Sequence, residues 1–316
     1  MFWDSEVSDM DRIYDMIVLG GGPAGYTAAL YGVRAGLDVR VLEQLGPGGQ
    51  MALTHMIDNY PGFPEGIDGF ELGMRIQQQA ERFGAGTEFA EVRGLDLKAS
   101  PKRIRTSEGE FLAKTVVIAA GAGPKPLGVA GEQELTGRGV HYCAACDGMF
   151  YRGKTVVVVG GGNSTAADAL ILSRMAKKVI VVHRRDILRA TQIYHKPLME
   201  AENIEIRWNS AVSELLHDGR LSGVKLRDTV TGAESILECD GLFVSIGRKP
   251  ASELVAGQLE LDGAGYIVAD ESTRTAIPGV YAAGDVRVTP LRQIVTAAAD
   301  GAVAAHFAAE YLSAEA

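Results

Sequence analysis

The sequence has little cysteine and no strongly basic block, and both shortages narrow what the protein can do. Three cysteines among 316 residues are too few for a disulfide-stapled secreted domain. The net charge of -9 is spread along the chain, so attraction to nucleic-acid phosphates or anionic lipids is not expected. We therefore predict neither a nucleic-acid partner nor a membrane partner.

A long uninterrupted apolar run is also missing. The longest candidate, residues 294–309, is broken by Asp300, Gly301 and His306, which argues against a membrane span. The first residues, MFWDSEVSDMDR, are acidic and lack the basic-then-apolar order of a secretory signal. These features predict a cytoplasmic protein.

The composition and length of the chain are those of a folded, soluble protein with more than one hydrophobic core. Hydrophobic residues make up 47% and charged residues 22% of the chain, as in ordinary globular domains. A length of 316 residues exceeds one typical core. We expect two domains.

One glycine-rich pattern occurs twice. YDMIVLGGGPAGYTAALYGVRAG and KTVVVVGGGNSTAADALILSRMA each run from a strand-like stretch through glycines into a helical stretch, and a second strand-like stretch follows. Such loops let a pyrophosphate approach bare backbone amides at a helix N-terminus, so we predict two dinucleotide sites. The candidate nucleotide-binding residues are Gly20, Gly22 and Gly25 in the first loop, and Gly160, Gly162, Asn163 and Ser164 in the second.

The second strand of each pattern predicts which nucleotide fits. Glu43 ends VRVLE, roughly 20 residues after the first loop, where a carboxylate can bind both ribose hydroxyls of FAD or NAD. The equivalent place in the second pattern reads HRRDILRA, which supplies His183, Arg184, Arg185 and Arg189. Guanidinium groups suit the 2'-phosphate of NADPH. A solvated basic turn is the alternative interpretation.

The segment HYCAACDGMF carries two of the three cysteines, Cys143 and Cys146. In a reducing compartment such a pair is catalytic or metal-bound more often than structural. Zinc needs four ligands and only the distant Cys239 remains, which fits a small buried hydrophobe. Two nucleotide sites and one CxxC pair predict a disulfide reductase, in which NADPH reduces a flavin and the flavin reduces the disulfide.

The motifs GGGPAGYTAALYGVRA, GPGGQ, DNYPGFP, GRGVHYCAACDGMFYRGK, HRRDILRA, GVYAAGD and LRQ stand in the order and spacing of one family. From about Tyr14 to Leu312 the chain resembles the low-molecular-weight thioredoxin reductases. The resemblance implies an α/β fold with two Rossmann-like, three-layer ββα domains, the NADPH domain being inserted into a split FAD domain. The implied boundaries are 1–121 with 248–316 for FAD, and 122–247 for NADPH and the CxxC pair.

The resemblance also assigns roles to single residues. Cys146 would face the flavin, Cys143 would attack the disulfide of the substrate, and Asp147 would protonate a departing thiolate, with helix capping as its plainer role. Rotation of the NADPH domain would alternate the two half-reactions. The implied FAD-binding residues beyond the first loop and Glu43 are Gly48, Gly49, Gln50, Asn59, Gly284, Asp285, Arg292, Gln293 and Ile294.

The implied partners are thioredoxin and a second copy of the chain. Positions matching the family's docking groove are Arg75, Phe83, Arg138, Met149 and Phe150, of which Phe83 and Met149 are equally suited to a core. In the second glycine motif Thr165 replaces a small residue of the family pattern, and Ala167 replaces a common Glu. AAGAG at 119–123 and MALTHM at 51–56 also depart from that pattern. No role follows for His141 or Trp208.

Two other functions remain open at this point. A flavin dithiol oxidase, or a reductase fed by another donor, would be reduced poorly by NADPH. A redox-sensing FAD module would be reduced but would turn over no disulfide protein. The intact arginine set favours the NADPH-dependent thioredoxin reductase.

Overall fold

The computed structural model describes residues 12–54 and 56–315. Within them the chain forms two compact units, one made of residues up to 123 together with 249–316, and one made of residues 124–248. The first unit is discontinuous because the second is inserted into it. The acidic start of the chain, on which the expectation of no secretory signal rests, lies outside the described residues.

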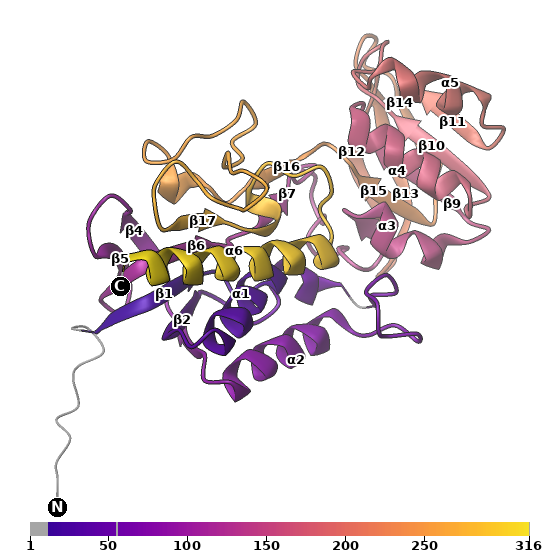
Figure 1. Cartoon of the computed structure of the whole chain (residues 1–316). Coiled ribbons are helices and arrows are strands. Elements are labelled where there is room, and N and C mark those ends of the chain that lie inside the picture. Colours follow the sequence, from indigo (N-terminus) through magenta and orange to yellow (C-terminus); the bar gives the residue numbers. More distant parts are fainter. Residues whose placement is uncertain (1–11, 55, 316) are drawn as a thin grey trace, which may run out of the picture. The chain divides into compact units, whose positions relative to one another are not determined.

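A seven-stranded sheet forms the centre of the discontinuous unit (Figure 1). Strands β3, β2, β1, β6 and β17 are parallel neighbours, and β5 and β4 extend the sheet with antiparallel pairing. The strands are β1 (Ile13–Leu19), β2 (Val39–Glu43), β3 (Gly86–Phe89), β4 (Val92–Asp96), β5 (Lys102–Thr106), β6 (Glu110–Ile118) and β17 (Val280–Ala282). The helices are α1 (Pro23–Arg34), α2 (Gly69–Arg82) and α6 (Ile294–Glu315).

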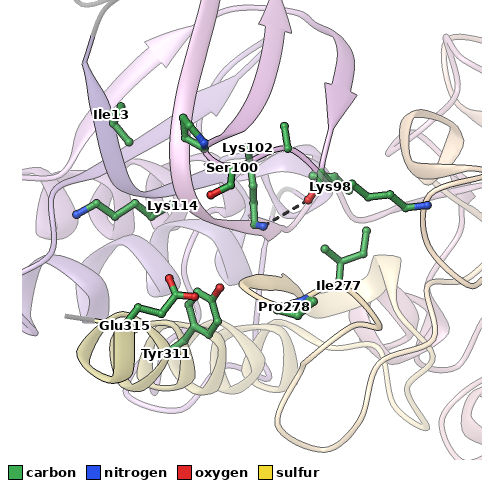
Figure 2. A pocket seen from close by; sticks show the side chains of 12 residues that line it. Ile13, Lys98, Ser100, Lys102, Lys114, Ile277, Pro278, Tyr311 and Glu315 are labelled. Atoms are coloured by element: carbon green, nitrogen blue, oxygen red, sulfur yellow. Dashed lines mark hydrogen bonds between the residues drawn. The ribbon is translucent and has the colours of Figure 1, made fainter.

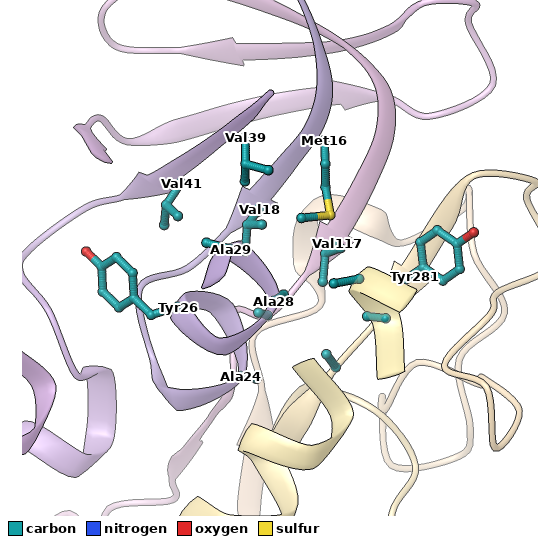
Figure 3. Close-up of a cluster of buried hydrophobic side chains, with 14 of the residues drawn as sticks. Met16, Val18, Ala24, Tyr26, Ala28, Ala29, Val39, Val41, Val117 and Tyr281 are labelled. Carbon is teal, nitrogen blue, oxygen red and sulfur yellow. The ribbon is translucent and has the colours of Figure 1, made fainter. Parts of the chain in front are cut away.

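Strand β1 shows why the sheet is buried on both faces. Met16 and Val18 belong to one apolar cluster, whereas Ile17 and Leu19 belong to the cluster on the opposite face. This alternation is the period of two of an extended strand, and apolar residues at every position are typical of a covered parallel strand. Figure 3 shows the cluster on the helix side, where Met16 and Val18 lie near the alanines of α1.

Small residues bring α1 and α6 close together. An added Cβ at Gly301 of α6 would overlap the backbone of Ala24 and would lie 2.9 Å from the nitrogen of Ala28. Only glycine permits this approach of the two helix backbones. The contact fixes the first turn of α1, which follows directly after the first glycine loop.

The inserted unit repeats the arrangement with a smaller parallel sheet, in the order β11, β10, β9, β15 and β8. Val157 and Val159 of β9 face a three-stranded antiparallel sheet, and Val156 and Val158 face the helices. The parallel strands are β8 (Val140–His141), β9 (Thr155–Val159), β10 (Lys178–Val182), β11 (Ile204–Arg207) and β15 (Gly241–Val244). The antiparallel strands are β12 (Ser210–His217), β13 (Leu221–Asp228) and β14 (Glu234–Glu238), and the helices are α3 (Ala144–Asp147), α4 (Asn163–Ser173) and α5 (Gln192–Glu200).

Two short strands at the chain crossings, β7 (Ala122–Pro124) and β16 (Arg248–Pro250), pair with each other. The predicted α/β class, with two Rossmann-like parallel sheets, is confirmed. In the described part of the chain no helix has the length and apolarity that a bilayer crossing requires.

Candidate functional site

The first glycine loop joins β1 to α1 in a conformation that requires glycine. Gly20 has a φ of +105°, and its N–H donates to the carbonyl of Leu42 at 2.9 Å. A Cβ on Gly25 would overlap the carbonyl oxygen of Gly20, whereas a Cβ on Gly22 would meet nothing within 4 Å. The loop is therefore closed beneath the helix and open at its N-terminus, where backbone amides can meet a phosphate.

Glu43 lies at the end of β2 and is anchored to this loop. Its Oε2 accepts a hydrogen bond of 2.6 Å from the N–H of Gly21, and its Oε1 accepts one of 2.9 Å from the N–H of Leu45. The carboxylate is thereby held beside the opening of the loop. This is the place from which a ribose would be bound.

Several other predicted FAD-binding residues gather around the start of α1. The N–H of Gly48 donates to the carbonyl of Gly21 at 2.8 Å, and a Cβ on Gly49 would lie 3.6 Å from the Cα of Gly22. Gly284, with a φ of +76°, would place a Cβ 3.0 Å from the Cβ of Ala24. Segments around residues 20, 48 and 284 thus meet at one helix N-terminus.

The remaining predicted FAD-binding residues also lie in the discontinuous unit. The side-chain amide of Asn59 donates to Oε1 of Gln293 at 3.0 Å, so the DNYPG and LRQ segments are in contact. Arg292 lies over the ring of Tyr266, 4.0 Å from its centroid. Gln50 is exposed beside Gly49, Asp285 follows Gly284 in a short 3-10 helix, and Ile294 begins α6.

The second glycine loop joins β9 to α4 in the inserted unit. Gly160 has a φ of +147°, and Gly162 is again open, because a Cβ there would meet nothing within 4 Å. Asn163 begins α4, and its side-chain oxygen accepts a hydrogen bond of 2.8 Å from the N–H of Thr191. Ser164 follows and is exposed. Thr165 is buried, and its hydroxyl donates to the carbonyl of Ser245 at 2.9 Å.

The residues at the end of β10 divide into one buried ring and three exposed cations. His183 is buried against Gly161, and its Nε2 lies 2.9 Å from the carbonyl oxygen of Ile187. Trp208 contacts the ring of His183 edge to face, at 6.1 Å between centroids. Among the described residues no ion pair engages the three arginines, which are exposed: Arg184, Arg185 and Arg189.

The two cysteines of the CxxC pair form a disulfide at the start of α3. Their Cα atoms are 5.3 Å apart, and both residues are partly exposed. Cys143 caps α3, and its sulfur accepts a hydrogen bond of 3.2 Å from the N–H of Cys146. The same N–H would stabilise a thiolate on Cys143 after reduction. Cys239 is buried, and burial raises its pKa to about 12, so that thiol stays protonated and unreactive.

The sequence assigned no role to His141, yet its ring is hydrogen-bonded at both nitrogens, and one of the partners is Asp147, the residue directly after Cys146. Nδ1 lies 2.9 Å from Oδ2 of Asp147, and Nε2 lies 2.6 Å from the hydroxyl of Tyr151. Phe243 stacks on the imidazole at 5.2 Å between centroids. His141 and Tyr151 are both buried. The only sequence signal was a histidine two positions before the first cysteine.

A cavity of about 410 Å³ lies elsewhere in the discontinuous unit and contains none of the predicted site residues (Figure 2). Its wall includes Lys98, Lys102 and Lys114. Lys102 donates to the carbonyl of Leu97 at 3.3 Å, and burial lowers the pKa of its amine. Lys114 is paired with Asp15 at 2.8 Å. The cavity is separate from the glycine loops.

Comparison with known proteins decides the family. Residues 14–301 match the model of the pyridine nucleotide-disulphide oxidoreductases. The chain belongs to this family. Family members named thioredoxin reductase from Listeria monocytogenes and Bacillus subtilis are each 44% identical over 96% of this chain, covering 95% and 96% of their own lengths.

Solved structures agree. The family member described as thioredoxin reductase from Streptococcus pyogenes superposes with a TM-score of 0.90 at 40% identity, covering 97% of this chain and 100% of its own. A thioredoxin reductase from Giardia duodenalis gives a TM-score of 0.89 at 37% identity over 96% of this chain and 99% of its own. The family resemblance read from the motifs is confirmed.

Proposed function

We propose that this chain is an NADPH-dependent thioredoxin reductase, in which Cys143 and Cys146 pass electrons to the disulfide of thioredoxin. The observation that carries the proposal is the bonded CxxC pair at the start of α3, within a chain that has a glycine loop in each unit. Relatives named thioredoxin reductase match nearly the whole chain, which supports the same assignment.

FAD and NADPH are the cofactors of this function, and the described residues fit both. FAD, when bound, accepts a hydride from NADPH and delivers the electron pair to the disulfide. The open space at Gly22 and the anchored carboxylate of Glu43 fit the pyrophosphate and ribose of FAD in the discontinuous unit. The open space at Gly162 and the exposed arginines that follow β10 fit NADPH in the inserted unit.

Each predicted site residue takes a place in this scheme. The first loop and residues 43–50 lie along the FAD nucleotide, and Asn59 is close to it. Gly284 and Asp285 approach the ribitol and pyrophosphate, and residues 292–294 border the isoalloxazine ring. Residues 160–164 bind the NADPH pyrophosphate. The 2'-phosphate is bound by Arg184, Arg185 and Arg189, and His183 supports the loop by packing against Gly161.

The chemistry of the cysteines is thiol-disulfide exchange. After reduction, the Cys143 thiolate attacks one sulfur of the thioredoxin disulfide, forms a mixed disulfide and releases the other sulfur. Asp147 supplies the proton that the released sulfur takes up. Cys146 then attacks the sulfur of Cys143, which re-forms the Cys143–Cys146 disulfide and releases thioredoxin as a dithiol.

The remaining parts of the proposal concern partners and motion. Met149 and Phe150 are 48% and 40% exposed shortly after the CxxC pair, which fits a protein substrate that contacts this segment, with Arg138 in the same unit. Rotation of the inserted unit about its two crossings alternates the half-reactions. The protein works as a cytoplasmic homodimer.

A dithiol oxidase, or a reductase with another electron donor, is not favoured. Neither function requires the three exposed arginines that follow β10. Among the described residues these arginines form no ion pair. The named relatives are thioredoxin reductases.

Single cysteine variants test the proposed function. Cys143→Ser and Cys146→Ser each remove one sulfur from the exchange, so NADPH-dependent reduction of thioredoxin should fall by roughly a thousandfold or more, while the flavin absorbance persists. Cys239→Ala is the matched control, because that buried thiol lies outside the exchange, and it should retain turnover. Full turnover in either serine variant would refute the proposal.

A further inference from the structure

His141, Asp147 and Tyr151 are joined by two hydrogen bonds, and with a neutral imidazole one tautomer satisfies all three side chains. Burial raises the pKa of the Tyr151 phenol, so this hydroxyl is protonated and can donate to Nε2 of His141. A ring that accepts at Nε2 carries its proton at Nδ1. Nδ1 then donates to Oδ2 of Asp147 at 2.9 Å, a charge-assisted bond when the carboxylate is ionised.

The surroundings hold the imidazole in this orientation. Its ring is stacked with Phe243 at an interplanar angle of 26° and meets Tyr151 edge to face at 5.2 Å between centroids. The His141 side chain is 8% exposed and that of Asp147 is 16% exposed. A buried ring with two hydrogen bonds and two aromatic neighbours has little freedom to turn.

We propose that His141 is a positioning residue for the disulfide exchange: through Tyr151 and its own Nδ1–H it fixes the Asp147 carboxyl and leaves Oδ1 as the oxygen that carries the transferable proton. The inference rests on the proposed function, since it assigns the geometry of the general acid used there. In this tautomer Oδ2 accepts the hydrogen bond of the Nδ1–H group. A proton on Asp147 therefore resides on Oδ1.

The step balances without any further reagent. The reduced Cys143–Cys146 pair gives two electrons to the substrate disulfide and becomes a disulfide, while the substrate becomes a dithiol. The proton on Oδ1 of Asp147 goes to the first sulfur that leaves. The carboxylate then takes the proton of the Cys146 thiol as it attacks Cys143 and passes that proton to the second sulfur that leaves, so the substrate ends as a dithiol and Asp147 as a carboxylate. His141 keeps its Nδ1 proton throughout.

Two isosteric variants separate the two hydrogen bonds of the ring. The side-chain amide nitrogen of Asn is bonded to Cγ, like Nδ1 of histidine, so His141→Asn can still donate to Asp147. The amide of Gln lies one bond farther out, near the position of Nε2, so His141→Gln keeps the contact with Tyr151 and loses the one with Asp147. Comparing the two variants therefore separates the contact with Asp147 from the contact with Tyr151, while the side chains differ in size by only one methylene group.

With thioredoxin as substrate, His141→Gln should lower kcat by about 10- to 100-fold, and His141→Asn by about threefold or less. KM for thioredoxin should be unchanged in both, because neither contact touches the docking surface. Near-ultraviolet circular dichroism and melting temperature report whether each variant is folded. Wild-type kcat in a folded His141→Gln variant would overturn the inference.

A double-mutant cycle distinguishes positioning from a merely structural role. In an Asp147→Asn background the acid is absent, so adding His141→Gln should change kcat by about twofold or less. A structural role would lower kcat by the same factor in both backgrounds, and that result would contradict the inference.

The leaving group offers a second discriminating measurement. Dithiobis-nitrobenzoate releases an aromatic thiolate of low pKa, which leaves without a proton. The loss in His141→Gln should therefore be large with thioredoxin and small with this aromatic disulfide. Equal losses with both substrates would also contradict the inference.

Failure of the proposed function would be recognised separately. If the wild type with NADPH turned over no thioredoxin, the proposed function would be wrong. The dithiothreitol-reduced wild type and the two variants would then be compared in single-turnover exchange with hydroxyethyl disulfide, an aliphatic substrate. The same ranking would support the positioning role on its own, and equal rates would refute it.

Discussion

The two glycine loops of this chain follow one backbone plan but are completed by different side chains. In the first, Glu43 accepts a hydrogen bond from the N–H of Gly21 at 2.6 Å. In the second, the ring of His183 packs against Gly161, and the residues after it present exposed arginines. The comparison shows that the loop forms a phosphate-binding site, whereas the residues at the end of the next strand determine which nucleotide fits.

The third position of the loop differs as well. Gly25 lies against the carbonyl of Gly20 so closely that a Cβ cannot fit. Thr165 stands at the equivalent place in the second loop and is fully buried, where its hydroxyl bonds the carbonyl of Ser245. At this third position the first loop is thus more tightly closed than the second, and it should tolerate substitution there less.

The largest expected effect on cofactor binding follows from the close contact between Gly25 and the carbonyl of Gly20. Gly25→Ala would force a Cβ into the Gly20 carbonyl, so the loop must shift, and FAD binding should weaken by about 100-fold or more. The flavin-to-protein ratio of the purified variant measures this loss. A yellow protein with the wild-type ratio would contradict the comparison.

The next largest effect is expected at the arginines that follow β10. Arg184→Gln removes one charge-assisted bond to the 2'-phosphate, so KM for NADPH should rise by about 10- to 100-fold, while KM for NADH stays nearly constant. Steady-state kinetics with both nucleotides checks the difference. Lys196→Gln, an exposed change on α5, is a control for the loss of one positive charge. Equal changes for NADPH and NADH would argue against a phosphate site here.

A smaller effect is expected at the acidic end of β2. Glu43→Gln keeps the size of the side chain but replaces a charged acceptor by a neutral one, which should weaken FAD binding by about tenfold. Fluorescence of released flavin during dilution gives the dissociation constant. The exposed Glu108→Gln in the same unit controls for net charge. An unchanged constant in Glu43→Gln would contradict the assigned role.

The smallest effect is expected at Thr165. Thr165→Ala removes one hydrogen bond of 2.9 Å, so stability should fall by about 1 kcal/mol and the melting temperature by about 2–4 °C. KM for NADPH should stay within about twofold. A tenfold rise would show that the second loop is as intolerant as the first.

Patterns with a fixed period could be predicted from the sequence. The run TVVVV in β9 places alternate valines in two clusters, as a covered parallel strand requires. The glycine loops were also predictable, since Gly20 and Gly160 both take positive φ values. Such features depend on neighbours in the chain and not on distant contacts.

Features set by short, irregular segments could not be predicted. His141, Asp147 and Tyr151 lie in β8, α3 and the 3-10 turn after it, and no period relates them, so their hydrogen bonds emerge only when these segments fold together. His183 was grouped with the arginines by sequence, but the ring is buried beneath the loop. Side-chain direction at a strand end is not encoded in spacing.

One anaerobic experiment tests the central claim that electrons pass from NADPH through the flavin and the Cys143–Cys146 disulfide to thioredoxin. The purified protein is mixed with NADPH, then with oxidised thioredoxin, while the visible flavin band is followed. The account predicts rapid bleaching by NADPH and recovery on addition of thioredoxin. Bleaching by NADH alone, or bleaching without recovery, would contradict it.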